Sequence, residues 1–301
     1  VVASISTDSG SSATDEITSD QTLEFSGTAE AGSEVEVFIG GVSIGTTTAN
    51  GTGSWTYDHS GTTLSEGTYS VTAEATDGAG NTSSTSSTLS VVVDITTPNA
   101  PVVLSITNDN GLSSTDEITN DQTLLITGTA EANSSVEVFI GGVSIGTTTA
   151  NGTGNWTYDH TGSTLAEGTY SITAEAKDAA GNTSSTSSAL SIEIDVTAPN
   201  APVVASISTD SGSSSTDELT NDQTLEFSGT AEAGSEVEVF IGGVSIGTTM
   251  ANGTGNWTYD HTGSTLAEGT YSITAEATDT AGNTSSTSSA LSIEIDVTAP
   301  N

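Results

Sequence analysis

One spacing runs through the whole chain: Trp55, Trp156 and Trp257 stand 101 residues apart. The segment LEFSGTAEAGSEVEVFIGGVSIGTT at 23–47 returns letter for letter at 225–249, two such intervals later. This period is too long for a solenoid, in which each repeat depends on its neighbours for a core. It is the size of a domain that folds around a core of its own. The sequence therefore predicts three tandem domains, at residues 1–98, 99–199 and 200–301.

Short segments with two prolines each, DITTPNAP at 94–101 and DVTAPNAP at 195–202, separate the predicted domains. Proline fixes its own φ and restricts the residue before it, so we expect these joints to be stiff. The chain begins where such a joint would end and finishes inside a third, DVTAPN. We therefore expect it to come from a longer array of the same domains.

Each predicted domain has the pattern of β-strands. Apolar and polar residues alternate in SEVEVFI (33–39), YSVTAEA (69–75) and LSVVVD (89–94). Alternation with a period of two is typical of half-buried antiparallel strands, and no helical periodicity interrupts it. We predict an all-β chain of three tandem immunoglobulin-like Greek-key β-sandwiches with about seven strands each. In the first domain these strands are expected near 2–6, 21–28, 33–40, 42–48, 53–58, 68–76 and 87–94.

Local motifs support this fold. The segment LSEGTY at 64–69 has the Leu-x-x-Gly-x-Tyr spacing of a tyrosine corner, in which a Tyr that opens a strand hydrogen-bonds back to the preceding backbone. Trp55 is expected on a central strand, as the anchor of the core. Gly40-Gly41 and NGTG at 50–53 are expected in hairpin turns, because no Lys or helix follows that would make a phosphate site.

The charge of the chain is almost entirely negative. It has one cationic side chain, Lys177, and 39 acids, for a net charge of −38. Nucleic acids and anionic membranes bind proteins through Lys and Arg, so both are excluded as partners. No apolar run approaches the roughly 18 residues of a membrane span, and the absence of cysteine excludes disulfides and thiolate metal sites. We predict a monomer without direct membrane insertion, whose partners are its own neighbouring repeats and cations.

The triplet Tyr-Asp-His at 57–59, 158–160 and 259–261 raises the question of a hydrolytic triad. Consecutive residues of a strand point to opposite faces, so Asp58 and His59 are badly placed to orient one another. We therefore predict no enzyme and interpret His59 as a strand-end residue near a turn. A ligand- or carbohydrate-binding module is the alternative function, and it would need an exposed aromatic surface or one divergent repeat.

Several motifs occur in a fixed order in every domain: GTAEAGSEV, GNWTYD (GSWTYD in the first copy), LAEGTYSITAEAKDAAGNTS and the joint DVTAPNAP. In these motifs the chain resembles the bacterial Ig-like tandem repeats of giant secreted adhesins of the RTX, biofilm-associated type. The resemblance covers all three domains. It implies a calcium-stiffened stalk, extended as a rod, that projects a distal ligand-binding region. It also implies an extracellular protein of the bacterial cell surface, exported by type I secretion.

Acid-rich loops recur at 5–21, 106–122 and 207–223. In an immunoglobulin-like sandwich, the loop after the first strand (the A–B loop) lies where the chain leaves the domain. The B–C and F–G loops lie where the chain comes in. We therefore expect the A–B loop of one repeat to meet the B–C and F–G loops of the next repeat at the joint. Carboxylates gathered there repel one another unless a cation lies among them.

Calcium is the cation that these residues suit best. Ca²⁺ takes about six to eight oxygen ligands in loose geometry, whereas Mg²⁺ demands a tighter octahedron and zinc and copper prefer His or Cys. The alternative for any single acid is a solvated surface charge, and Asp20, Asp121 and Asp222 also fit a turn in which the side chain binds the backbone. The predicted Ca²⁺ ligands are Asp8, Asp15, Glu16, Glu30, Asp77, Asp94, Asp109, Asp116, Glu117, Glu131, Asp178, Asn182, Asp195, Asp210, Asp217, Glu218, Glu232, Asp279, Asn283 and Asp296.

Overall fold

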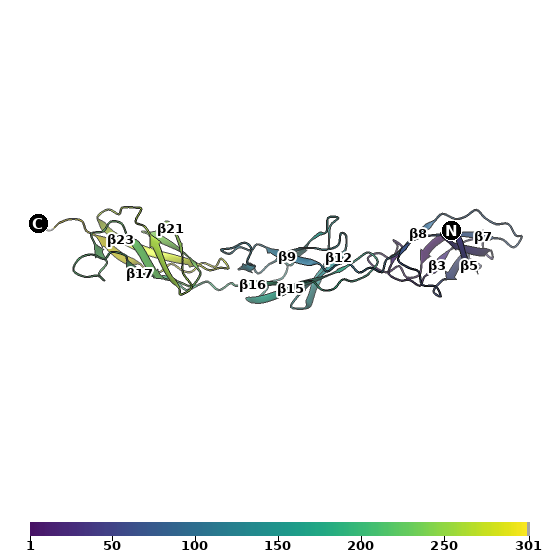
Figure 1. Ribbon diagram of the computed structural model, residues 1–301, viewed down its shortest axis with the longest axis horizontal. Helices are drawn as coiled ribbons and strands as arrows, with labels where there is room; N and C mark the ends of the chain where they lie inside the picture. Colours follow the sequence, from purple (N-terminus) through teal and green to yellow (C-terminus); the bar gives the residue numbers. More distant parts are fainter. Residues whose placement is uncertain (300–301) are drawn as a thin grey trace. The chain divides into compact units, whose positions relative to one another are not determined.

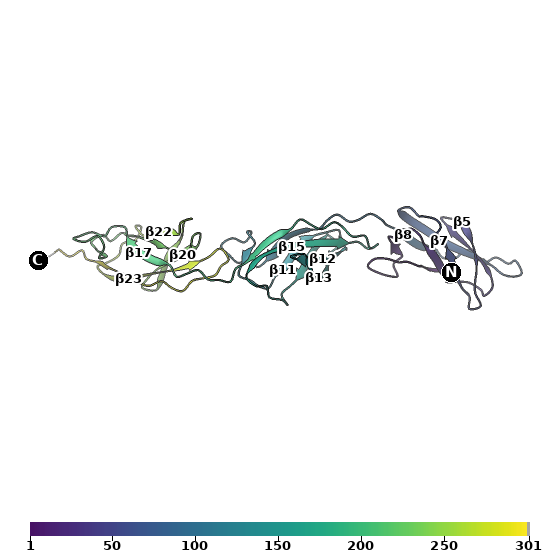
Figure 2. The same cartoon turned by 90° about the horizontal axis from the view of Figure 1, so that it is seen from below.

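The computed structural model describes residues 1–299 (Figure 1). These residues form strands and loops without an α-helix, as both perpendicular views show (Figure 2). No helix long and apolar enough to cross a membrane is found among them. The chain divides into two compact units. The first contains Val1–Leu104, Thr127–Tyr158 and Ser171–Leu190, and the second contains the rest of the chain.

Eight strands form each repeat, in the same order each time. The first repeat has β1 (Val2–Ile5), β2 (Ile17–Thr18), β3 (Glu24–Thr28), β4 (Glu34–Ile39), β5 (Val42–Thr48), β6 (Ser54–Asp58), β7 (Gly67–Thr76) and β8 (Leu89–Val93). The second has β9 (Val102–Thr107), β10 (Ile118–Thr119), β11 (Leu125–Thr129), β12 (Ser135–Ile140), β13 (Val143–Thr149), β14 (Asn155–Asp159), β15 (Gly168–Lys177) and β16 (Leu190–Ile194). The third has β17 (Val203–Ile207), β18 (Leu219–Thr220), β19 (Glu226–Thr230), β20 (Glu236–Ile241), β21 (Val244–Met250), β22 (Asn256–Asp260), β23 (Gly269–Thr278) and β24 (Leu291–Ile295).

Two sheets build each repeat. In the first repeat the smaller sheet has the order β1-β3-β6, and the larger sheet has the order β2-β8-β7-β4-β5. The second repeat combines β14-β11-β9 with β10-β16-β15-β12-β13, and the third combines β17-β19-β22 with β18-β24-β23-β20-β21. The predicted all-β fold of three tandem immunoglobulin-like sandwiches is therefore confirmed.

The alternation in the sequence decides which side chains form the core. Val35 and Val37 of β4 are 1% and 0% exposed, whereas Glu34, the first residue of the same strand, faces solvent. Val71 of β7 and Phe25 of β3 are also fully buried and belong to the same cluster. Burial of a side chain of this size contributes about 1.5–3 kcal/mol, so these alternating positions are a main source of the stability of each repeat.

One strand was not predicted. β2 is a two-residue strand inside the segment that the sequence indicates as the A–B loop, and it pairs in parallel with β8, Ile17 opposite Val92 and Thr18 opposite Val93. Two residues are too few for an alternating pattern to be recognised. Thr18 is fully buried, and its hydroxyl donates to the Thr7 carbonyl at 2.7 Å. The loop is therefore fastened to the large sheet in its second half, at Ile17 and Thr18.

Trp55 is buried as predicted, with 3% of its surface exposed, but its strand is not central. β6 lies at the edge of the three-stranded sheet, beside β3. The indole covers Gly27 of β3, where an added Cβ would lie 2.5 Å from the ring. The glycine therefore makes room for the tryptophan, and this close approach lets an edge strand supply a core side chain.

The tyrosine corner and the glycine turn are confirmed. The Tyr69 hydroxyl donates to the Ser65 carbonyl at 2.8 Å, and Tyr170 and Tyr271 make the same bond at 3.0 Å. Gly40 and Gly41 have φ values of 58° and 78° and join Ile39 to Val42 as a two-residue hairpin loop. Positive φ at both positions is the requirement of a type I′ turn, which glycine meets without strain.

Candidate functional site

The A–B loops bring the first three predicted acids of each repeat together. In the first repeat the Glu16 amide donates to Oδ2 of Asp8 at 3.1 Å, and the Ile5 amide donates to Oε2 of Glu16 at 3.2 Å. The Ile17 amide donates to Oδ1 of Asp15 at 3.2 Å. The same arrangement holds Asp109, Asp116 and Glu117 in the second repeat. In the third repeat the amides of Glu218 and Leu219 donate to Asp210 and Asp217 in the same way, whereas Oε2 of Glu218 has no hydrogen-bond partner among residues 1–299.

These loops contain buried carboxylate oxygens without a partner. Oδ1 of Asp8, Asp109 and Asp210 is buried and accepts no hydrogen bond within the described chain, and the same is true of Oε2 of Glu218. A buried acceptor left unsatisfied costs about 1–3 kcal/mol, and more when it is charged. An orphaned oxygen at the same position of every repeat is an atom to which a cation could bind.

The glutamates of these loops are also strained. Glu16, Glu117 and Glu218 have φ values of 59°, 61° and 59°, a left-handed conformation that non-glycine residues seldom adopt. Burial raises the pKa of Glu16, and the negative charges of Asp8 and Asp15 add to the rise, against a hydrogen bond from the Ile5 amide. The pKa of Glu117 and of Glu218 is raised in the same way. In each of the three repeats, the surroundings of this glutamate therefore disfavour its ionised form.

The F–G loop acids have a different arrangement. Oδ1 of Asp178 accepts the amides of Gly181 and Asn182 at 2.8 and 2.9 Å, and Oδ2 accepts the Asn182 side chain at 2.9 Å. Asp77 with Asn81 and Asp279 with Asn283 form the same local turn. These carboxylates, which we predicted as calcium ligands, already have hydrogen-bond partners within their own loops.

The A–B and F–G loops do meet at the joint, through backbone carbonyls and an amide side chain. In the first compact unit, Nδ2 of Asn182 donates to the Asp94 carbonyl at 2.9 Å. The Ser9 hydroxyl donates to the Ala180 carbonyl at 2.8 Å, and the Ser11 amide donates to the Ala179 carbonyl at 3.2 Å. Asn182 thus takes part in the joint as a hydrogen-bond donor.

The second compact unit repeats this set of contacts one repeat later. Nδ2 of Asn283 donates to the Asp195 carbonyl at 2.8 Å. The amides of Leu112 and Asn120 donate to the carbonyls of Thr280 and Ala281, each at 3.1 Å. The two joints therefore use the same positions of the repeat.

A glutamate that the sequence did not single out fastens the joint peptide. The Thr96 hydroxyl donates to Oε2 of Glu66 at 2.7 Å, and the Thr96 amide donates to Oδ1 of Asp94 at 3.0 Å. Glu66, Asp94 and the predicted ligand Glu131 line one hollow of about 400 Å³. The sequence could have indicated this contact, because a Glu recurs 30 residues before a Thr in every repeat. The equivalent residues are Glu167, Asp195 and Thr197 in the second repeat and Glu268, Asp296 and Thr298 in the third.

The remaining predicted ligands lie in the B–C loops. The Glu131 carbonyl accepts the Ser134 hydroxyl at 2.7 Å, and Glu30 and Glu232 bind Ser33 and Ser235 in the same way. Among the described residues 1–299, no group of three or more His, Cys, Asp or Glu side chains is arranged so that it could hold a metal ion. Calcium binding by any of these residues therefore stays a prediction.

The Tyr-Asp-His triplet is arranged as a turn. Oδ1 of Asp58 accepts the Ser60 amide at 2.8 Å, and hydrogen bonds from Ser60 lower the pKa of Asp58. The His59 amide donates to the Leu23 carbonyl, and its own carbonyl accepts the Thr62 amide. His59 is a strand-end residue beside a turn, as predicted.

Comparison with known proteins gives a family match over nearly the whole chain. The model of the family described as bacterial Ig-like domain matches residues 2–95, 96–196 and 197–297. Exoglucanase B of Cellulomonas fimi is 30% identical over 266 residues, which cover 86% of this chain and 22% of that protein. The chain thus spans about a fifth of the length of this curated relative.

Two solved structures are similar over most of the chain. One belongs to a 1.5-MDa bacterial ice-binding adhesin, in a study of host cell surface retention, with 23% identity, a TM-score of 0.37 and 92% of both chains covered. The other is a tetra-tandem repeat in the extending region of a large adhesion protein. It has 22% identity and a TM-score of 0.31, and the match covers 98% of this chain and 74% of that one.

Proposed function

The chain belongs to the bacterial Ig-like domain family, and on that premise we propose that it is a structural spacer in a surface adhesin. Its three repeats would project a more distal ligand-binding region from the bacterial cell surface. An extracellular location follows from that role, with type I secretion as the export route. In this proposal the repeats act as a spacer between the cell surface and the ligand-binding region, and no catalytic step is assigned to them.

The observation that carries this proposal is the recurrence of one joint. The Asn182 amide reaches the Asp94 carbonyl in the first compact unit, and the Asn283 amide reaches the Asp195 carbonyl in the second. A spacer needs each repeat to engage the next one in the same way, whereas a binding module needs only one surface with its own chemistry. The two joints use equivalent contacts, which favours the spacer over the binding module.

The carbohydrate-binding alternative has less support. An aromatic platform for sugars must be exposed, and Trp55, Trp156 and Trp257 are only 3%, 3% and 2% exposed. Each repeat has this single tryptophan, and it packs inside the core. We therefore assign the tryptophans to stability.

We further propose that Ca²⁺ binds at the A–B loops. In the first repeat Asp8, Asp15 and Glu16 would draw closer together to hold it, and the equivalent acids would do so in the other two. The support is the orphaned Asp8 oxygen, the left-handed Glu16 and the raised pKa of its carboxyl group. A bound divalent cation would supply positive charge where the chain has none, and would stabilise the loop that contacts the next repeat.

Two measurements on the full chain test the proposal. Calorimetric titration with CaCl₂ should show saturable binding, and small-angle scattering should give a larger maximum dimension with Ca²⁺ than with chelator. The triple variant E16Q/E117Q/E218Q should lose the calcium response, while E36Q/E137Q/E238Q, on half-buried strand positions outside the A–B loops, should keep it. Binding without any change in scattering would refute the stiffening role. A glycan that binds saturably to one repeat would refute the spacer itself.

A further inference from the structure

Four asparagines of the chain are followed directly by a glycine: Asn50, Asn110, Asn151 and Asn252. Asparagine is one of the residues that age chemically in proteins. In an Asn-Gly pair, the glycine amide nitrogen can attack the carbonyl carbon of the asparagine side chain, because glycine has no side chain that hinders the approach. The structure separates one of these four pairs from the other three.

Three of the pairs are held in the turn before the tryptophan strand of each repeat. Oδ1 of Asn50 accepts the amides of Thr52 and Ser54 at 2.9 and 3.1 Å, and the Thr52 hydroxyl at 2.7 Å. The Asn50 amide also donates to the Ser54 carbonyl at 2.8 Å. Asn151 and Asn252 make the equivalent bonds. The side chain must rotate before it can be attacked, which would break these bonds, so the three pairs are protected.

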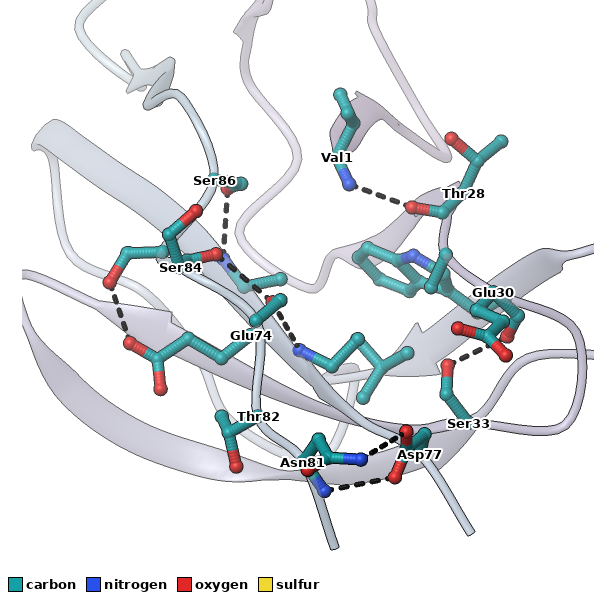
Figure 3. A pocket seen from close by; sticks show the side chains of 17 residues that line it. Val1, Thr28, Glu30, Ser33, Glu74, Asp77, Asn81, Thr82, Ser84 and Ser86 are labelled. Carbon is teal, nitrogen blue, oxygen red and sulfur yellow. Dashed lines mark hydrogen bonds between the residues drawn. The ribbon is translucent and has the colours of Figure 1, made fainter. Parts of the chain in front are cut away.

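An asparagine outside these pairs is also held. Figure 3 shows Asn81 beside Asp77, with two hydrogen bonds between them. The next residue is Thr82, and its branched side chain crowds the amide nitrogen that would attack. Asn81 therefore lacks both conditions for the reaction, a free side chain and a glycine after it.

Asn110 meets both conditions. It is exposed to solvent in the A–B loop of the second repeat. The nearby Asn108 donates to Asp121 at 2.9 Å, whereas the Asn110 side chain makes no hydrogen bond within the part of the chain that the structure describes, residues 1–299. Over the same residues the Gly111 amide finds no acceptor. Both reacting groups are therefore free to approach one another.

The peptide bond between Asn110 and Gly111 lies in the contact with the third repeat. An added Cβ on Gly111 would lie 1.8 Å from the Thr280 carbonyl oxygen, and one on Gly282 would lie 2.8 Å from the Asn110 carbonyl oxygen. The next amide, that of Leu112, donates to the same Thr280 carbonyl at 3.1 Å. This packing leaves no room for an extra atom in the backbone here.

We propose that Asn110 deamidates spontaneously and that the product weakens the second joint. The Gly111 nitrogen forms a bond to Cγ of Asn110 while the Cγ–Nδ2 bond breaks. The proton of the Gly111 amide goes to the leaving nitrogen, so ammonia departs and a cyclic succinimide remains. Water then adds to either carbonyl of the ring and opens it. One product is aspartate, and the other is isoaspartate, in which the main chain runs through Cγ and gains an extra carbon.

Isoaspartate disturbs the joint more than aspartate does. Its extra main-chain carbon displaces Gly111 from the Thr280 carbonyl, whereas aspartate only adds a negative charge to an acidic loop. In the first joint the residue before Gly10 is Ser9, which has no side-chain carbonyl and cannot form a succinimide. The ageing therefore affects the second joint and spares the first.

Peptide mapping of the full chain tests the site. After incubation in warm, mildly alkaline buffer, mass spectrometry of peptic fragments should show conversion at Asn110 at least about tenfold faster than at Asn50, Asn151 or Asn252, a difference of about 1.4 kcal/mol in activation free energy. Isoaspartate methyltransferase, with labelled S-adenosylmethionine as the probe, should label the aged chain much more strongly than aged Asn110→Gln, because glutamine cyclises far more slowly. Conversion at Asn110 that is no faster than at the other pairs, or equal labelling of the two chains, overturns the proposal.

Hydrogen exchange followed by NMR tests the effect on the joint. In the aged chain the Leu112 amide should exchange faster than in the fresh chain. The Ser11 amide, which donates to the Ala179 carbonyl at 3.2 Å in the first joint, should keep its rate. Aged Asn110→Gln should keep both rates. If circular dichroism shows that this variant is unfolded, the fresh and aged unmodified chains are compared, with Ser11 as the internal reference. Unchanged exchange at Leu112 after isoaspartate has formed from Asn110 overturns the proposal.

Discussion

The side-chain amide of Asn182 donates one hydrogen bond to Asp178 in its own loop and a second to the carbonyl of Asp94, 88 residues earlier in the chain. One residue thus connects a local turn to a joint. Asn81 forms the same turn but no joint contact, because among residues 1–299 its side-chain amide donates only to Asp77. The chain therefore contains its own control for the energy of the joint contact.

Asn182→Ala should destabilise the chain more than Asn81→Ala does. Both substitutions remove the turn hydrogen bond, and only Asn182→Ala removes the bond to the Asp94 carbonyl, which is worth about 0.5–1.5 kcal/mol. Urea unfolding followed by tryptophan fluorescence measures the difference in free energy of unfolding. Equal losses for the two variants would mean that the joint contact contributes nothing.

The strands could be predicted because their pattern is long enough to recognise. β4 and β7 have six and ten residues, so alternation separates Val35 and Val37 from their polar neighbours. β2 has only two residues, and its parallel pairing with β8 depends on tertiary structure that no local pattern encodes.

The candidate site was harder to predict because the same residue types, Asp and Asn, occur both in calcium-binding loops and in loops that hydrogen-bond to themselves. A loop with Asp and Asn can bind calcium or close on itself, and the Asp178 loop closes on itself through three hydrogen bonds. The bond between Glu66 and Thr96 was missed because it joins two loops that are 30 residues apart. Only the repetition of this pair in all three repeats carried a signal.

Thr96→Val should loosen the first joint. Valine has the shape of threonine but cannot donate to Glu66, so the joint peptide loses one of its two anchors. The cost is small, roughly 0.5 kcal/mol for an exposed hydrogen bond. Nitrogen-15 relaxation should show greater motion at Thr96 and Thr97. The matched variant Thr298→Val breaks the equivalent bond to Glu268, and it should leave the relaxation at the first joint unchanged.

Gly10→Ala should disrupt the contact between the A–B loop and Ala179. Gly10 and Gly212 have similar φ values, 116° and 122°, so alanine causes comparable backbone strain at both, about 1–3 kcal/mol. Only at Gly10 does the new methyl meet a carbonyl oxygen, which adds about 1–3 kcal/mol of overpacking. The difference in melting temperature between Gly10→Ala and Gly212→Ala measures this second cost. No difference would show that the loop moves away freely.

The dependence of stability on pH should change sign when calcium is added. The folded-state pKa of Glu16, Glu117 and Glu218 is raised, first by burial and then by neighbouring aspartates. The folded chain then binds these protons more tightly than the unfolded chain. Its free energy of unfolding should rise as the pH falls through the window just above the ordinary glutamate value. This is the expected behaviour in chelator.

Calcium would favour the ionised glutamates and lower their pKa, so in its presence acidification through the same window should release the ion and reduce stability. Asp20, Asp58 and Asp77 have lowered pKa values. Their protonation therefore destabilises the folded chain only at a lower pH than the glutamate window, and it does not mask the effect. Urea titrations at a series of pH values, with and without CaCl₂, measure both slopes. In E16Q/E117Q/E218Q the two slopes should coincide, because relief of the general negative charge is then all that acidification brings. Slopes of the same sign in the unmodified chain would mean that these glutamates bind no calcium.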